Sequence, residues 1–211
     1  MNKNLYIQAG PAPARSGKAL IMVHGRGGSA EDILQLAAHL PVGGFSLLAP
    51  QAKNNSWYPY SFLAPVPQNQ PSLDQSLATL QAVKQDLNQE GISDENIYWL
   101  GFSQGACLSL EFVTRNATRF GGVIAFTGGL IGATPDTTSY NGNFNGTPVL
   151  IASSDPDPHV PVGRVEESSR IIREMGADVL TKIFPGMGHT ITGEEIELAT
   201  THVFNAVKTS L

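Results

Sequence analysis

The chain has 211 residues, of which 41% are hydrophobic and only 15% are charged, and its formal net charge is −5. This composition excludes a wholly disordered or fibrous chain. Lysine and arginine form no basic run, so we do not expect nucleic acid as a partner. The length favours a single domain over residues 1–211 that buries a large core.

The first twenty residues contain no apolar stretch of the length that a signal peptide needs, and no window approaches the roughly 20 apolar residues of a membrane span. We therefore expect a cytoplasmic protein without stable membrane anchoring. The single cysteine, Cys107, excludes an intramolecular disulfide and is expected to be a buried packing residue.

Short apolar runs recur along the chain and predict strands. Most are apolar at successive positions rather than at alternate ones, which is typical of strands buried on both faces of a parallel sheet. The predicted strands are residues 19–23, 45–49, 97–102, 123–126, 149–153 and 179–184.

Amphipathic segments lie between these runs and predict helices. The predicted helices are residues 29–40, 72–90, 106–113 and 162–175, and a last one that begins at Thr192 and buries Ile196, Val203 and Val207. Capping pairs are expected at three starts, Ser29 with Asp32, Ser72 with Gln75 and Thr192 with Glu195, and terminating glycines at Gly91 and Gly176.

The alternation of strands and helices predicts the α/β fold class, as a doubly wound, mostly parallel sheet with helices on both faces. Two stretches, 51–71 and 127–147, show no regular pattern, and the first carries four prolines. A loop this long within a folded domain is usually functional. In such folds, loops at the carboxyl ends of the strands shape the ligand crevice.

The strongest local signal is the sequence Gly-Phe-Ser-Gln-Gly at residues 101–105. It follows a predicted strand and precedes a predicted helix, which is where G-x-S-x-G indicates a nucleophile elbow. Such a turn exposes the hydroxyl of Ser103 beside a helix N-terminus. The alternative is an ordinary turn in which Ser103 is only a helix cap.

A serine hydroxyl needs a base, and the chain offers five histidines. His39 and His202 lie in predicted helices, His24 ends the first core strand and His159 adjoins a proline-rich loop. Only His189 lies on a loop after the last predicted strand, which is where the Ser–acid–His order of α/β-hydrolases puts the base.

The acid is expected between these two residues, on a loop after a strand. Asp155 and Asp157 both meet that condition, and spacing alone does not choose between them. The alternative for either is turn chemistry.

An oxyanion hole would complete the site. One donor is expected from the N–H of Gln104, directly after the nucleophile, and the other from the N–H of Arg26 in the glycine-rich loop after the first predicted strand. A phosphate-binding loop is the alternative, but neither the G-x-G-x-x-G spacing nor a GK[ST] element is present.

The motifs HGRGG, PQA…SWYPY, GFSQGA, DPHVP and GMGHT, in this order, resemble the carboxylesterase/phospholipase family of α/β-hydrolases, which includes acyl-protein thioesterases and bacterial carboxylesterases. The resemblance runs from about residue 17 to the C-terminus. It implies an α/β-hydrolase fold without a large lid, Asp157 as the acid of a D-P-x-V-P pattern, and Arg26 and Gln104 at the oxyanion-hole positions.

The resemblance also suggests which residues contact substrate. Trp57 would lie beside the acyl pocket, and Leu130 and Ile131 would line it. The full set of candidate substrate-binding residues is Trp57, Tyr58, Phe62, Leu130, Ile131 and Met187. Two departures from the family stand out: Ser153-Ser154 replaces His-Gly before the acid loop, and Arg26, whose side chain could favour a polar or anionic substrate, replaces a common leucine.

We therefore expect a serine hydrolase that cleaves small carboxylic esters of short to medium acyl chain through an acyl-enzyme, without a cofactor or metal. Acyl-protein thioesterase or lysophospholipase activity on the same machinery is the alternative, and a non-catalytic binding module is a further one. The apolar segment 57–63 would serve either a pocket or a homodimer contact.

Overall fold

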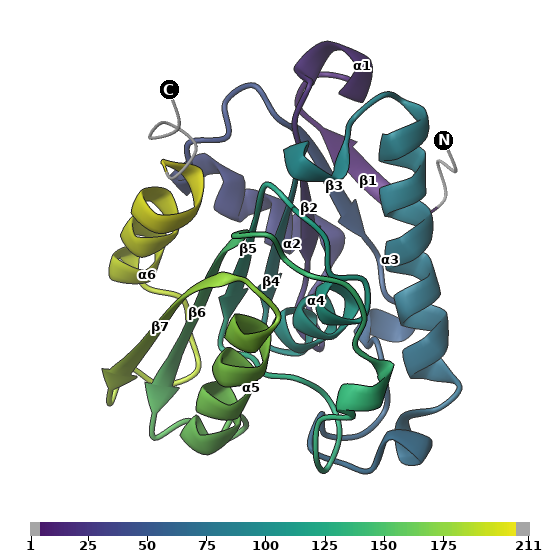
Figure 1. Ribbon diagram of the computed structural model, residues 1–211. Coiled ribbons are helices and arrows are strands. Elements are labelled where there is room, and N and C mark those ends of the chain that lie inside the picture. Colours follow the sequence, from purple (N-terminus) through teal and green to yellow (C-terminus); the bar gives the residue numbers. More distant parts are fainter. Residues whose placement is uncertain (1–4, 206–211) are drawn as a thin grey trace.

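A computed structural model describes residues 5–205, and its centre is a sheet with the strand order β1-β3-β2-β4-β5-β6-β7 (Figure 1). Strand β1 pairs antiparallel with β3, and every other pairing is parallel. The strands are β1 (Tyr6–Ala9), β2 (Ala19–Val23), β3 (Ser46–Pro50), β4 (Ile97–Phe102), β5 (Gly122–Phe126), β6 (Pro148–Asp155) and β7 (Asp178–Pro185).

The α-helices lie between successive strands, except for α6, which follows β7. They are α1 (Pro13–Ser16), α2 (Ala30–Leu34), α3 (Ser72–Gln89), α4 (Gln104–Arg115), α5 (Val162–Glu174) and α6 (Gly193–Leu198). Shorter elements are 3-10 turns at Gln35–His39, Lys53–Asn55, Val66–Asn69, Asp94–Asn96 and Thr137–Ser139, and a π-helical segment at Ala199–Phe204. Within residues 5–205, no helix combines the length and the apolar character that spanning a bilayer requires.

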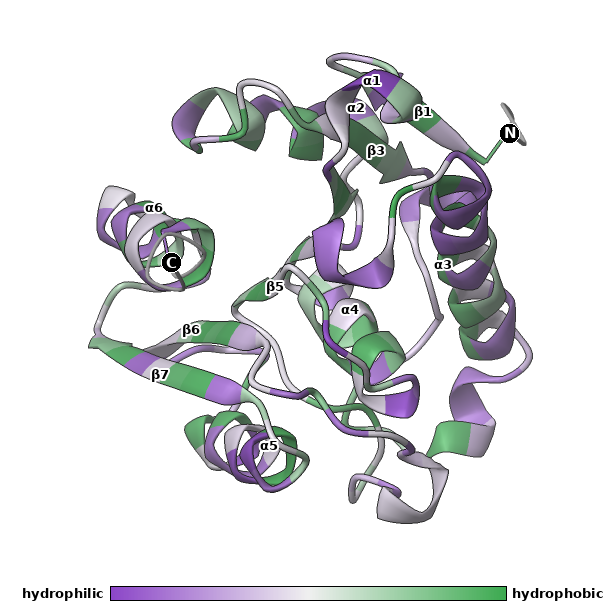
Figure 2. Cartoon of the chain, turned by 45° about the horizontal axis from the view of Figure 1, so that its top comes forward, coloured by the Kyte–Doolittle hydropathy of each residue, from purple (hydrophilic) through white to green (hydrophobic). Residues whose placement is uncertain are grey.

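The sheet is buried on both faces, which explains why its strands are continuously apolar. In β2, Ile21 and Val23 belong to the cluster covered by α3, α4 and α5, whereas Leu20 and Met22 belong to the cluster on the other face with α2 and the C-terminal helix. Figure 2 shows α5 and α6 on opposite sides of β6 and β7. The predicted doubly wound α/β class is confirmed.

Strand β1 was not expected from the sequence. Its four residues pair only with β3, in the register Tyr6–Pro50 to Ala9–Leu47, and form the edge of the sheet. So short a segment carries little periodicity, and its pairing depends on a partner some 40 residues away.

Two of the three expected helix caps are present. The Ser29 hydroxyl accepts from the Asp32 N–H and the Asp32 carboxylate accepts from the Ser29 N–H, and Thr192 and Glu195 form the same reciprocal pair. The predicted helix 29–40 is nevertheless α-helical only to Leu34 and continues as a 3-10 turn.

The expected capping pair of Ser72 and Gln75 is wrong. Ser72 is already the first residue of α3 and Pro71 occupies the cap position, so the Ser72 hydroxyl does not cap the helix. Instead the Gln70 side-chain oxygen accepts from the Asp74 N–H at 3.2 Å. A glutamine side chain replaces the cap that Pro71 lacks.

Terminating glycines follow α3 and α5 as expected. Gly91 and Gly176 both have φ of 88°, a left-handed conformation that favours glycine. Of the predicted face of the last helix, Val203 is buried and Val207 lies outside the described residues.

Candidate active site

Ser103 lies at the turn between β4 and α4, at the carboxyl end of the sheet. Its backbone has φ of 54° and ψ of −119°, a conformation that costs a non-glycine residue about 1–3 kcal/mol. The Ser103 N–H donates to the Phe126 carbonyl at 2.9 Å, and the Ser103 carbonyl accepts from the Cys107 N–H at 3.0 Å. These bonds hold the serine in the strained geometry of a nucleophile elbow.

The two glycines that flank Ser103 are required by close backbone approach. A Cβ atom at Gly101 would overlap the Gly105 carbonyl, and one at Gly105 would overlap the Val23 carbonyl of β2. A side chain at Gly101 would force β4 and α4 apart, and one at Gly105 would force α4 away from the end of β2. The strand-to-helix placement of the motif therefore has the steric basis that the sequence suggested.

Three side chains from distant parts of the chain form one hydrogen-bonded series. His189 Nε2 lies 2.8 Å from Ser103 Oγ, and His189 Nδ1 lies 2.8 Å from Asp157 Oδ2. A carboxylate only accepts, so Nδ1 carries a proton and Nε2 of the neutral ring is free to accept from the serine hydroxyl. The loops after β4, β6 and β7 supply the three residues.

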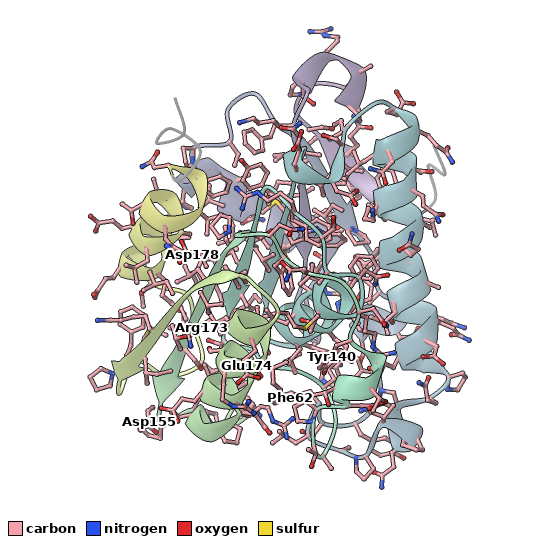
Figure 3. All side chains as sticks on the ribbon, in the orientation of Figure 1. Phe62, Tyr140, Asp155, Arg173, Glu174 and Asp178 are labelled. Atoms are coloured by element: carbon pink, nitrogen blue, oxygen red, sulfur yellow. The ribbon has the colours of Figure 1, made fainter. Side chains whose placement is uncertain are left out.

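The carboxylate of Asp157 is wholly buried behind the imidazole. Its Oδ1 accepts from the N–H groups of His159 and Val160, each at 2.8 Å. Burial acts to raise the pKa of Asp157, but these bonds and the one from His189 outweigh it and hold the pKa below its usual range. Asp155 instead is exposed at the end of β6 (Figure 3).

Two hydrogen bonds to the end of β6 anchor the loop just before His189. The Ser154 hydroxyl accepts from the Gly188 N–H at 2.9 Å, and the Asp155 carbonyl accepts from the Gly186 N–H at 2.8 Å. The sequence marked Ser154 only as a departure from the family pattern. The structure gives this buried residue a positioning role beside the imidazole.

Two aromatic rings pack against the imidazole of His189. Phe102 lies 5.3 Å away and His159 5.0 Å away between ring centroids, the latter edge-on. With both ring nitrogens of His189 engaged and two rings in contact with it, the imidazole is held in its orientation toward Ser103.

The expected oxyanion donors lie next to Ser103. Gln104 is the first residue of α4, so its N–H has no partner within the helix. The Arg26 N–H follows Gly25, where an added Cβ would come within 3.4 Å of Ser103 Cβ. Among residues 5–205, neither N–H donates a hydrogen bond, so both are free for a ligand.

The side chains of the same two residues hold the adjoining loop. The Arg26 guanidinium donates to Ser56 Oγ and to the carbonyls of Pro59, Tyr58 and Tyr60, at 2.8–3.0 Å. The Gln104 amide accepts from the Trp57 N–H and donates to the Tyr58 carbonyl. The Tyr58 carbonyl thus accepts from both.

The glycine-rich loop at 24–28 and the loop at 51–60 share further bonds. The Gly27 N–H donates to the Asn55 carbonyl at 2.7 Å, and the Trp57 indole donates to the His24 carbonyl at 2.8 Å. Together with the Arg26 bonds, these contacts make the two loops one rigid wall of the site.

A cavity of about 710 Å³ opens beside Ser103, within the range typical of ligand sites. It is lined by Arg26, Tyr58, Pro59, Tyr60, Ser61, Phe62, Leu63, Ser103, Gln104, Cys107, Pro158, His159, Val160, Pro161 and His189. Of the candidate substrate-binding residues, Tyr58 and Phe62 are therefore in its wall.

The other four candidates lie elsewhere. The Trp57 side chain is turned toward His24, with ring centroids 4.9 Å apart. Leu130 and Ile131 are buried in the core. Met187 packs in the cluster on the opposite face of the sheet. The loop positions of these residues were anticipated, but the direction in which each side chain points was not.

The buried Cys107 contributes its side chain to the floor of the cavity. Burial raises the pKa of its thiol to about 12, so the thiol stays protonated near neutral pH and does not compete with Ser103 as a nucleophile. Within the described residues, no group of three or more His, Cys, Asp and Glu side chains is arranged to hold a metal ion.

Comparison with known proteins identifies the family of the chain. Residues 2–206 match the model of the phospholipase/carboxylesterase family. The crystal structure of a phospholipase/carboxylesterase from Dyadobacter fermentans superposes with a TM-score of 0.94 at 50% identity, over 96% of this chain and 97% of that one.

Curated relatives are more distant. Acyl-protein thioesterase 1 of Gibberella zeae is 31% identical over 54% of this chain, and the match spans about half of its own length, 49%. Acyl-protein thioesterase 1 homolog 1 of Dictyostelium discoideum is 28% identical over 94% of this chain and 93% of its own. The chain has the α/β-hydrolase fold and belongs to the phospholipase/carboxylesterase family of hydrolases.

Proposed function

We propose that this chain is a serine hydrolase that cleaves carboxylic esters of short to medium acyl chain through an acyl-enzyme. The observation that carries the proposal is the series of 2.8 Å contacts from Ser103 through His189 to Asp157. A nucleophile, a base and an orienting carboxylate in this order are the requirements of acyl transfer by serine.

In the first half-reaction, Ser103 Oγ attacks the ester carbonyl carbon while its proton passes to His189 Nε2. The carbonyl oxygen becomes an oxyanion and accepts from the N–H groups of Arg26 and Gln104. Each such donor contributes about 10²–10³ in turnover. Asp157 stabilises the imidazolium, which then protonates the departing alkoxide as the C–O bond to the alcohol breaks.

In the second half-reaction, a water molecule takes the place of the alcohol. His189 Nε2 removes a proton from it as its oxygen attacks the acyl carbon. The tetrahedral intermediate collapses, the bond to Ser103 Oγ breaks, and the proton returns to that oxygen. The acid leaves and the free enzyme is restored.

The cavity favours small ester substrates. It has no large lid within residues 5–205, and its wall is a mixture of aromatic rings, proline rings and hydroxyl groups. The same mechanism can hydrolyse lysophospholipids and the thioesters of acylated proteins. Because several relatives are named acyl-protein thioesterase, thioesterase activity is the second candidate function.

A fluorophosphonate probe tests the nucleophile. We expect stoichiometric labelling of the wild-type protein and of Ser93→Ala, which removes an exposed hydroxyl, and none of Ser103→Ala. Labelling of Ser103→Ala, or none of the wild type, would refute the proposal and favour a binding module. A series of C2 to C16 p-nitrophenyl esters with matched thioesters then sets the preferred acyl group.

From the sequence we also propose a cytoplasmic location and a homodimer formed through segment 57–63. We propose small esters, and not nucleic acid, as the ligands. Sedimentation velocity at micromolar concentration tests the homodimer.

A further inference from the structure

The cavity beside Ser103 carries positive charge and no negative charge of its own. Arg26 is the one permanently charged residue in its wall, and none of its lining residues is Asp or Glu. The chain as a whole has a net charge of −5. The charge of the cavity wall is therefore opposite in sign to the net charge of the chain.

Within residues 5–205, Arg26 has no carboxylate partner. All four of its guanidinium hydrogen bonds end on carbonyl or hydroxyl oxygens of residues 56–60. These use the hydrogens of the two terminal nitrogens, and within residues 5–205 the Nε–H donates no hydrogen bond, so one donor of the fork remains. The positive charge is held in place by the loop without being neutralised by it.

Two carboxylates adjoin the site without lining this cavity. The Asp157 carboxylate is buried behind His189 and takes hydrogen bonds from three N–H groups. Asp32 shares a second cavity, of about 270 Å³, with the other side of Arg26, but it is bound to the backbone and hydroxyl of Ser29.

A helix end adds to the positive potential. The N-terminus of the twelve-residue helix α4 points into the site at Gln104, with the positive end of its dipole. Charges of one sign in a cleft attract a ligand of the opposite sign and orient it.

We propose that Arg26 makes this site selective for esters that carry a carboxylate in the part of the substrate that occupies the cavity. The proposal rests on the ester hydrolysis proposed above and names its substrate class. Arg26 acts twice: its backbone N–H serves the oxyanion, and its side chain, fixed by the 56–60 loop, recognises the anionic group.

Two pairs of matched esters test the selectivity and show which half of the substrate carries the charge. Mono-p-nitrophenyl adipate is compared with p-nitrophenyl hexanoate, and 4-carboxyphenyl butyrate with phenyl butyrate, each corrected for spontaneous hydrolysis. We expect kcat/KM to favour the anionic member of at least one pair by about tenfold or more, as for a charge-assisted hydrogen bond. A preference in the first pair places the anion in the acyl half, and in the second pair in the alcohol half.

Raising the salt concentration from 0.05 to 0.5 M should lower kcat/KM for the anionic ester only, because ions screen the exposed guanidinium. Arg26→Met should reduce the ratio of anionic to neutral kcat/KM about tenfold, and Arg26→Lys should retain part of it. The ratio is the readout, because both substitutions also loosen the loop and slow every substrate.

Two control variants separate charge from loop rigidity. Ser56→Ala removes one partner of the Arg26 fork but keeps the charge, and should slow both esters equally. Arg170→Met removes an exposed positive charge on α5 and should leave the ratio unchanged.

The proposal is overturned if the neutral esters are preferred at every salt concentration, or if the ratio is the same in Arg26→Met as in the wild type. If Arg26→Met does not fold, the salt titration of the wild type decides the matter. If no ester of either kind is hydrolysed, it is the hydrolase function that fails instead.

Discussion

Two histidines, His24 and His189, each follow a strand at the carboxyl end of the sheet, and their surroundings differ. His24 is 1% exposed, and its ring nitrogens contact the Gly25 carbonyl at 2.7 Å and the Ala52 N–H at 3.1 Å. The side chain of His189 is 22% exposed, and its nitrogens contact a carboxylate and a hydroxyl.

The comparison shows that a fully engaged imidazole is a structural element or a base according to its partners. Backbone groups fix His24 as the neutral Nδ1–H tautomer, and burial lowers the pKa of His24. At His189 the partners are a carboxylate, which orients the ring, and a hydroxyl, which can give up its proton to it. We therefore expect a substitution of His24 to lower the stability of the fold and a substitution of His189 to lower turnover.

The largest expected effect is at His189. His189→Gln should lower kcat for p-nitrophenyl butyrate by on the order of 10⁶, because the serine loses its base. Its free energy of unfolding, from urea denaturation, should change little since the side chain is partly exposed. His39→Gln, at an exposed position, is the control and should keep wild-type kcat. A drop of less than a hundredfold in His189→Gln would remove His189 from the mechanism.

Asp157→Asn should lower kcat about 10⁴-fold, because the imidazole loses its orienting charge. Asp155→Asn, two residues away and exposed, should stay within a few-fold of the wild type. Equal losses in both variants would show that the two carboxylates are not distinguished as the structure indicates.

The same carboxylate gives a pH-dependent stability. Its folded pKa is lowered, so its contribution is full above the unfolded value of about 3.9 and is lost as pH falls through the folded value. Urea denaturation should therefore find wild-type and Asp157→Asn proteins differing at pH 7 and converging below about pH 4. A constant difference would contradict the lowered pKa.

His24→Leu should cost about 2–4 kcal/mol of unfolding free energy, because the Ala52 N–H and the Gly25 carbonyl lose their partners. Since the pKa of His24 is lowered on folding, wild-type stability should also decline as pH falls below about 6.5, and this decline should be weaker in the variant. An unchanged midpoint in urea would mean that His24 does not tie the two loops together.

The smallest expected effect is on the free energy of unfolding, through the backbone strain at Ser103. Ser103→Gly and Ser103→Ala should both be inactive, but the glycine variant should be about 1 kcal/mol more stable. It relieves the positive φ, although glycine's greater freedom in the unfolded chain offsets part of the gain. If the alanine variant is the more stable one, the turn stores no strain.

Much of this site could be predicted because its determinants are local. The strand–Gly-x-Ser-x-Gly–helix order placed Ser103, and the position after the last strand placed His189. The choice of Asp157 over Asp155 came only from the family resemblance, and the structure explains it by burial and by the N–H groups of His159 and Val160.

The remainder depends on three-dimensional packing. Trp57 and Tyr58 are neighbours in one loop, yet one side chain turns to His24 and the other to the cavity. The four acceptors of Arg26 lie 30–34 residues away along the chain, so no local sequence pattern predicts these contacts. At the start of α3, Pro71 occupies the cap position, and the Asp74 N–H donates to the Gln70 side chain, which the expected capping pair did not include.

The Tyr58 carbonyl, which accepts from both Arg26 and Gln104, limits how the substrate range can be changed by mutation. The residues that would polarise the ester bond, Arg26 and Gln104, also anchor the segment that shapes the substrate cavity. Insertions or loop grafts between 56 and 60 meant to widen substrate range should therefore depress the rate with every substrate. New specificities are more accessible through Leu63 or Val160, which line the cavity without touching that anchor.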